Sequence, residues 1–240
     1  MAQATVSPVP HRIFSHNPIR AFYQSSIGKK ITVAVTGVIL IVFVIGHLLG
    51  NLEMYLGPDH TNWYAEFLRS TGPLLWIVRI ILLLAVVVHI VATIQLTLEN
   101  RRAKPQKYAV KAPQASTFAS RTMIYSGLLV LCFVIYHLLQ FTFQTTNPEF
   151  RTLTDAQGRH DVYHMVILGF RQPLISLFYV LALFLLSVHL SHGFASVSQT
   201  LGINNRKVSG LISNGGQVLS WLIFAGYASI PATVLLRILR

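Results

Sequence analysis

The chain contains ten histidines, and five of them lie inside long apolar stretches. His47, His89 and His137 stand in the first three stretches, and the fourth contains both His189 and His192. A lone imidazole in such a helix can simply hydrogen-bond to a neighbouring helix. Ionisable groups in membrane-spanning sequence are nonetheless candidates for function. The other five histidines lie in polar segments, where we expect solvated side chains.

The positions of four of these histidines predict two layers. His47 and His137 each lie 16 residues beyond the start of their apolar stretch, on helices that run in one direction. At 1.5 Å per residue, both imidazoles lie about 24 Å from the edge where those helices begin. His89 and His189 lie 16 and 18 residues into helices that run the opposite way, so both fall near that same edge.

Two imidazoles at one depth on facing helices are the ligands that a six-coordinate haem b requires. Cys132 is the single cysteine, which excludes a disulfide, a four-cysteine iron–sulfur cluster and a C-x-x-C-H haem attachment. A zinc site would gather its ligands at one depth, usually with a carboxylate or thiolate. A metal-free proton relay is a further alternative.

Composition places these histidines in a membrane. The 240 residues are 53% hydrophobic and 11% charged, with a mean hydropathy of +0.57. Soluble domains carry about 25% charged residues, so a water-soluble enzyme is excluded. The net charge of +12 would suggest nucleic acid in a polar chain, but here the apolar stretches indicate a lipid bilayer and no nucleic-acid partner.

Five apolar stretches are each long enough for an α-helix to cross about 30 Å of hydrocarbon. They predict an all-α integral membrane protein with one domain over residues 1–240, in which the first four helices form the histidine-bearing bundle. The expected helices span residues 29–55, 73–101, 119–146, 170–201 and 207–238. A short amphipathic helix is expected over residues 61–70, and residues 147–171 are expected to form a polar loop.

The distribution of lysine and arginine predicts the orientation. Twelve basic residues and one acidic residue fall on the side of the N-terminus, against seven basic and six acidic residues on the other side. The N-terminus is therefore expected in the cytoplasm, and five crossings then place the C-terminus outside.

Several motifs together resemble the five-helix, dihaem cytochrome b membrane anchor of succinate dehydrogenases and fumarate reductases. The resemblance covers nearly the whole chain. The motifs are SSIGKK at 25–30, TG at 36–37, GHLLGN at 46–51, SRTM at 120–123, YHLL at 136–139, HLSHG at 189–193, Ser196 and QTLG at 199–202.

The resemblance implies two haem b groups, the outer held by His47 and His137 and the inner by His89 and His189. Composition does not decide between His189 and His192. The family's spacing to the glycines that follow selects His189, which leaves His192 as a neighbour of a propionate or quinone, or as a helix contact. The implied role is electron transfer to or from quinone, with menaquinone favoured. The implied protein is a multi-pass subunit of the cytoplasmic membrane that serves the tricarboxylic acid cycle or fumarate respiration. The implied partners are a flavoprotein and an iron–sulfur subunit, because this chain carries no dicarboxylate chemistry.

Quinone-site candidates follow from the same resemblance. Ser26 and Lys30 have the spacing of a serine and a basic residue that bind quinone in related anchors, although a helix cap and a snorkelling lysine would look the same. Glu66 is a candidate proton donor or acceptor at an external site, or an ordinary surface charge. Arg79 could pair with a propionate of the outer haem or snorkel outward. Arg121 is a further candidate near a haem.

Two alternatives remain open on the sequence. One is the dihaem anchor of another respiratory complex, although two histidines about four turns apart on each of two helices, the bc-type pattern, are absent. The other is a haem-free transporter or assembly protein whose histidines handle protons.

Overall fold

The computed structural model describes residues 17–103, 118–203 and 209–240. Within these ranges the chain is helical and contains no strand, although Thr154 and His160 pair in an isolated antiparallel bridge. The helices are α1 (Pro18–Gln24), α2 (Ser26–Leu52), α3 (Pro58–Ser70), α4 (Pro73–Arg102), α5 (Phe118–His137), α6 (Val162–Phe170), α7 (Pro173–Thr200) and α8 (Ser209–Leu235), with 3₁₀ turns η1 (Glu53–Leu56) and η3 (Pro148–Thr152) and a π-helical turn η2 (Leu138–Thr142).

Five of these helices are long and apolar enough to cross a membrane: α2 with η1, α4, α5 with η2, α7 and α8. The predicted number of spans is confirmed, and the chain has the character of a multi-pass membrane protein. The third span is shorter than expected, because the helix ends at Thr142 rather than at residue 146. There the backbone widens into the π-helical turn directly after His137.

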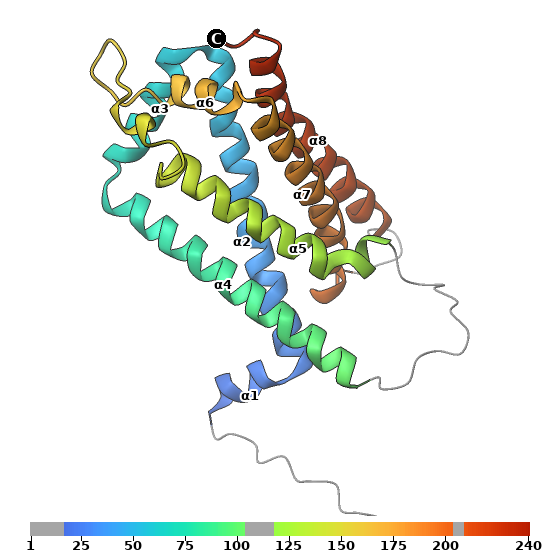
Figure 1. The fold of residues 1–240 in the computed structure, drawn as a ribbon. Helices are drawn as coiled ribbons and strands as arrows, with labels where there is room; N and C mark the ends of the chain where they lie inside the picture. Colours follow the sequence, from blue (N-terminus) through green and yellow to red (C-terminus); the bar gives the residue numbers. More distant parts are fainter. Residues whose placement is uncertain (1–16, 104–117, 204–208) are drawn as a thin grey trace, which may run out of the picture.

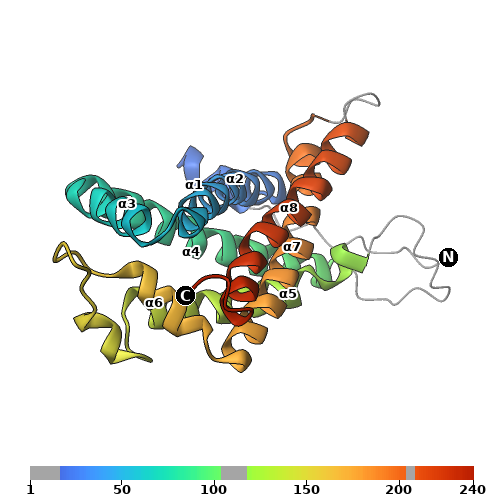
Figure 2. The same ribbon diagram turned by 90° about the horizontal axis from the view of Figure 1, so that it is seen from above.

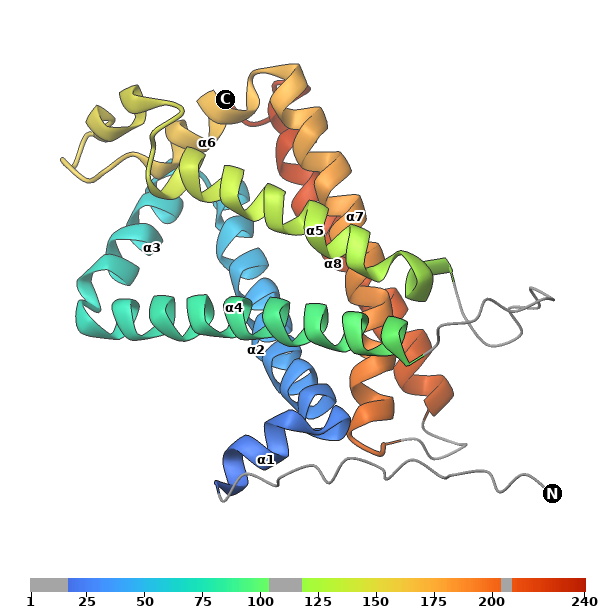
Figure 3. The same cartoon turned by 60° about the horizontal axis from the view of Figure 1, so that its bottom comes forward.

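α7 and α8 form the most extensive helix contact, and the four histidine-bearing helices also associate as two packed pairs (Figure 1). α2 packs along α4, and α5 packs along α7, whereas α4 and α5 meet at most marginally. α7 is the central helix, since it also contacts α2, α6 and α8. α8 lies beside α7, as Figures 1 and 3 show. Most large apolar side chains of α4 are exposed, as expected for a helix that faces lipid.

Local sequence explains where the helices begin. The side chain of Ser25 caps α2 by accepting a hydrogen bond from the Gly28 amide. The cap is thus Ser25 rather than Ser26. Proline occupies the first position of α4 and of α7, where its missing N–H costs no hydrogen bond. Gly72 has φ +55°, and this positive value allows the sharp turn between α3 and α4.

One end of the bundle carries α3, α6 and the C-terminus; we call it the loop end (Figure 2). α3 confirms the predicted amphipathic helix and begins three residues earlier, at Pro58. Residues 147–171 differ from the expected polar loop, because they contain the largely buried helix α6. Its apolar residues, Tyr163 and Ile167 among them, pack in one cluster with α7 and α8.

A buried polar cluster joins α3 to α6 at the loop end. The amide of Asn62 donates to Asp155 and Asp161, and its carbonyl accepts from the Tyr163 N–H. Asp161 also caps α6 by accepting from the His164 N–H. Burial opposes ionisation of Asp161, but these hydrogen bonds and nearby His164 outweigh it and lower the pKa of the Asp161 carboxyl.

Candidate functional site

The structure brings His47 and His137 together near the loop end. Their ring centroids lie 5.9 Å apart in an edge-to-face arrangement, on α2 and α5. The two helices belong to different packed pairs, so this imidazole pair spans the interface between them. The distance is short enough for both rings to bind one metal atom. We call these two residues the loop-end pair.

His89 and His189 form the second pair predicted from the sequence, which we call the inner pair. They stand on α4 and α7, which again belong to different packed pairs. Nδ1 of His89 lies 3.0 Å from the Thr36 hydroxyl on α2. Nδ1 of His189 lies 3.1 Å from the Ser126 hydroxyl on α5.

The two pairs occupy different depths. Thr36, which contacts His89, precedes His47 on α2 by 11 residues. Ser126, which contacts His189, precedes His137 on α5 by the same 11 residues. Eleven residues span about 16 Å and make close to three whole turns, so one face of each helix serves both depths. The contacts with Thr36 and Ser126 therefore place His89 and His189 at a different depth from His47 and His137.

A glycine follows each of these hydroxyl residues and faces the same imidazole. A Cβ placed on Gly37 would lie 3.5 Å from Cε1 of His89, an ordinary contact. A Cβ on Gly127 would lie 3.2 Å from Cε1 of His189, which is tighter than normal packing allows. Gly127 thus lets α5 approach the His189 ring closely.

The hydroxyl partners fix the protonation of the inner rings. Thr36 donates its own proton to the Thr32 carbonyl, and Ser126 donates to the Met123 carbonyl. Each hydroxyl therefore accepts from the imidazole Nδ1–H. The lone pair then resides on Nε2, which is the state of a histidine that binds a metal through Nε2.

His137 follows the same rule through a different partner. Its Nδ1 lies 3.4 Å from the Tyr179 hydroxyl, which donates to Oε1 of Gln140 at 2.8 Å. Gln140 is fully buried in the π-helical turn, and its Nε2 has no hydrogen-bond partner among the described residues. π-Turns are frequent at functional sites, and this one places Gln140 within reach of Tyr179.

The surroundings of His47 are aromatic. Phe43 stacks on its ring at 5.3 Å, and Tyr227 of α8 lies 6.1 Å away. The Asn51 amide lies 3.3 Å from Nε2 of His47, so this nitrogen acts as the acceptor. All four histidines of the two pairs therefore carry their lone pair on Nε2.

The remaining candidates lie apart from the pairs. Ser26 and Lys30 are exposed at the start of α2, and Glu66 is exposed on α3. His192 is half-buried, one turn after His189, and makes no hydrogen bond within the described ranges. The side chain of Arg121 lies outside the described part of the structure. No group of three or more His, Cys, Asp or Glu side chains is placed to share a metal in the described ranges.

The lysine that the structure buries is Lys29, next to the candidate Lys30. Its ammonium pairs with Glu99 at the end of α4 and also donates to the Gln24 carbonyl. Tyr23 donates to Gln95 one turn away. These contacts fasten α1 and α2 to α4 beneath the inner pair. Sequence analysis did not single out Lys29, Ser126 or Tyr179, although the equal 11-residue spacing on α2 and α5 would have indicated Ser126.

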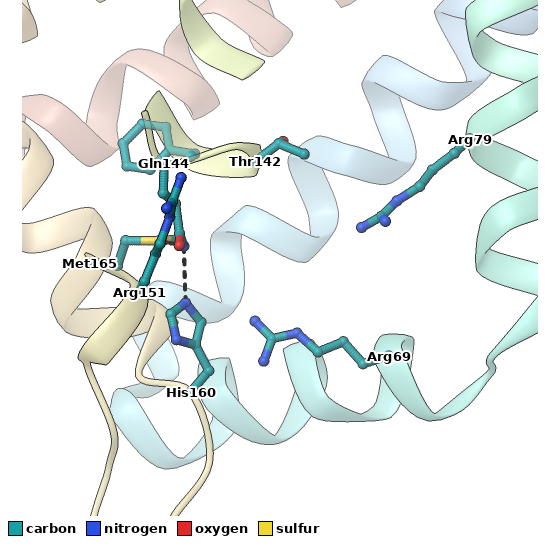
Figure 4. Close-up of a pocket in the computed structure, with 8 residues that line it drawn as sticks. Arg69, Arg79, Thr142, Gln144, Arg151, His160 and Met165 are labelled. Atoms are coloured by element: carbon teal, nitrogen blue, oxygen red, sulfur yellow. Dashed lines mark hydrogen bonds between the residues drawn. The ribbon is translucent and has the colours of Figure 1, made fainter. Parts of the chain in front are cut away.

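An open cavity of about 420 Å³ lies at the loop end (Figure 4). Its lining comprises Arg69, Arg79, Phe141, Thr142, Gln144, Arg151, His160 and Met165. Arg79 lies 5.1 Å above the Trp76 ring and reaches into this space from α4. Nε2 of His160 lies 3.2 Å from the Gln144 amide. Burial and the nearby Arg69 lower the pKa of His160 below its usual value, so the ring is neutral at pH 7.

Comparison with protein-family models, with curated protein sequences and with solved structures finds no match for this chain. The functional argument therefore depends on the residues and their geometry.

Proposed function

We propose that this chain is the dihaem cytochrome b membrane anchor of a succinate:quinone oxidoreductase. In this role it passes electrons between an iron–sulfur subunit and membrane quinone, and a partner flavoprotein performs the dicarboxylate chemistry. The observation that carries the proposal is the presence of two imidazole pairs at two depths, each with one histidine from the α2–α4 pair of helices and one from the α5–α7 pair.

His47 with His137, and His89 with His189, would hold two b-type haems. His89, His137 and His189 present an Nε2 lone pair and donate Nδ1–H to a hydroxyl that can accept it, and the Nε2 lone pair of His47 accepts from the Asn51 amide. Such partners fix the orientation of a ligating imidazole and raise its basicity. Haem supplies one-electron transfer, which none of the side chains at these positions performs alone. Two carriers about 16 Å apart along α2 would divide the crossing of the membrane into two steps.

The chain itself positions and insulates these carriers. Aromatic side chains surround the loop-end pair: Phe133, Phe141 and Tyr179 each have a ring centroid within about 6 Å of that of His137. Gly37 and Gly127 keep the helices close to the inner imidazoles. Apolar packing of this kind excludes water and helps set a redox potential.

The excess of lysine and arginine favours a cytoplasmic location for the α1 end, where the soluble partner subunits would dock. Electrons would then pass through the inner pair first. The quinone binds either beside Ser26 and Lys30 at this end or near Glu66 at the other end, with menaquinone as the favoured quinone.

A reduced-minus-oxidised optical spectrum of the purified full chain tests the proposal. We expect a b-type α-band and two haems per chain by pyridine haemochromogen assay. His89→Ala should retain one haem, whereas His164→Ala, at the exposed loop end, should retain two. The complex isolated from native membranes should also contain the flavoprotein and iron–sulfur subunits and reduce quinone with succinate. Absence of the α-band from the full chain would refute the proposal and favour a haem-free transporter or assembly protein.

A further inference from the structure

The cavity at the loop end is lined by positive charge. Arg69 reaches into it from α3 and Arg79 from α4, and Arg151 enters from the segment after the π-turn (Figure 4). Among the described residues, no aspartate or glutamate lines the cavity. Among the described residues, none of these three arginines forms an ion pair with a carboxylate.

Arg159 provides a contrast on the same end of the molecule. Its guanidinium binds Asp155 and Asp59, both at 2.7 Å, and these carboxylates raise the pKa of the Arg159 side chain. Arg159 is therefore neutralised by two carboxylates, in contrast to the three arginines of the cavity. Arg151 donates to the Phe143 carbonyl and Arg79 lies over the Trp76 ring, but neither contact neutralises a charge. Three guanidinium groups that line one cavity without a counter-ion indicate a site for an anion.

The cavity adjoins the loop-end pair of histidines. Phe141 lines it, and the ring of Phe141 lies 5.7 Å from that of His137. A cofactor held between His47 and His137 would thus have one edge within reach of the cavity. Gln144 and the neutral His160 ring add polar groups to the lining, and the Gln144 amide donates to Nε2 of His160.

We propose that this cavity binds the two propionate carboxylates of the haem held by His47 and His137. This inference rests on the function proposed above. Two ionised carboxylates are costly within a membrane unless cations face them. Arginine is suited to the task because its planar fork binds carboxylate through two parallel hydrogen bonds. The sequence suggested Arg79 as a partner for a propionate. The structure adds Arg69 and Arg151 to the proposed propionate site, so three separate chain segments contribute to it.

The test uses the full chain with Arg69→Gln, Arg79→Gln and Arg151→Gln, singly and combined. Arg171→Gln is the matched control, since it removes one positive charge at the loop end without touching the cavity. Loss of cations beside the propionates favours the ferric haem. We therefore expect the midpoint potential of the loop-end haem to fall by about 59 mV in the combined variant. For a one-electron couple this corresponds to a tenfold change in the redox equilibrium. The inner haem and the control should keep their potentials.

Two further measurements identify the anion. Redox infrared difference spectra of protein containing haem labelled with ¹³C at the propionate carboxyls should show labelled bands that shift in the combined variant. Bound phospholipid, measured as phosphate per chain, should be the same in the variant and the wild type. Unchanged labelled bands together with loss of one phosphate per chain would show a lipid phosphate in the cavity and overturn the inference.

The outcomes separate this inference from the function. If the wild type contains no haem, the proposed function fails. If both haems are present and the combined variant alters neither potential, only the assignment of the cavity fails. Retention of the inner haem in every variant is the internal control for folding.

Discussion

The Ser126 hydroxyl on α5 lies 3.1 Å from Nδ1 of His189 on α7, and this contact separates His189 from His192, three residues later. Because Ser126 donates its proton to a backbone carbonyl, His189 must donate to it and keep the Nε2 lone pair free. We therefore predict that His189→Ala abolishes the inner haem, whereas His192→Ala retains it, with at most a shifted midpoint potential. Haem content and redox titration measure both. Loss of a haem only in the His192 variant would reverse the assignment.

The pairing of histidines across the two helix pairs makes a second prediction. His47→Ala and His137→Ala should each remove the same haem, because their rings face each other at 5.9 Å. His89→Ala should remove the other. The measurement is a redox titration of the α-band in each variant, which resolves the two components by potential. The layer assignment is wrong if the His47 and His89 variants lose the same component.

The hydroxyl beside His89 should tune its haem without being needed to hold it. Thr36→Val removes the acceptor of the His89 Nδ1–H. The imidazole then donates less electron density, the ferric form loses stabilisation, and the potential of the inner haem should rise. A hydrogen bond worth about 1 kcal/mol corresponds to roughly 40 mV for a one-electron couple. Potentiometry of the inner haem measures the change.

Thr32→Val is the control for this effect. Thr32 stands one turn earlier on α2 and donates only to the Gly28 carbonyl. Loss of the Thr32 hydroxyl should leave the midpoint potentials of both haems unchanged. Equal shifts in the Thr32 and Thr36 variants would mean that the helix, and not the contact with His89, causes them.

Lys30 tests the quinone site at the α1 end. Lys30 is exposed four residues after Ser26, whereas its neighbour Lys29 is buried against Glu99. We predict that Lys30→Ala lowers the rate of quinone reduction while both haems stay spectrally intact, and stopped-flow reoxidation of the haems by quinone measures it. Lys29→Ala should instead weaken the attachment of α2 to α4 and lower the melting temperature. Unchanged quinone kinetics in the Lys30 variant would move the site toward Glu66.

The polar cluster at the loop end predicts a pH dependence of stability. Hydrogen bonds hold the pKa of Asp161 below the value of about 3.9 for an unfolded aspartate. Its contribution is therefore present above about pH 4 and is lost as the pH falls through the folded pKa. Asp161→Asn should cost about 1.5–3 kcal/mol at neutral pH, seen as a lower melting temperature.

A melting series from neutral pH downward checks this linkage. The difference between Asp161→Asn and wild type should shrink below about pH 4, where the wild-type carboxyl also protonates. Glu149→Gln, at an exposed carboxylate of the same end, should melt like the wild type. A difference that stays constant at every pH would show that the aspartate acts through its shape and not through its charge.

The sequence by itself determined the number of membrane-spanning helices and their approximate positions in the chain. Runs of about 20 apolar residues must be helices that cross a bilayer, because lipid offers the backbone no hydrogen-bond partner. The 1.5 Å rise per residue then placed the four histidines in two layers, since depth along a straight helix depends only on residue count. The layers appear in the structure through the contacts of Thr36 and Ser126. The function that these layers support stays a prediction.

Tertiary packing alone decided which groups meet. Residue count gives depth but not rotation or neighbours, so it could not show that Ser126 faces His189 or that Tyr179 reaches both His137 and Gln140. The π-turn after His137 and the buried helix α6 also escaped, because short apolar segments carry no distinctive period. Arg69, Arg79 and Arg151 are far apart in the chain. Only the fold of the loop end brings them to one cavity, because their positions depend on how three separate segments pack.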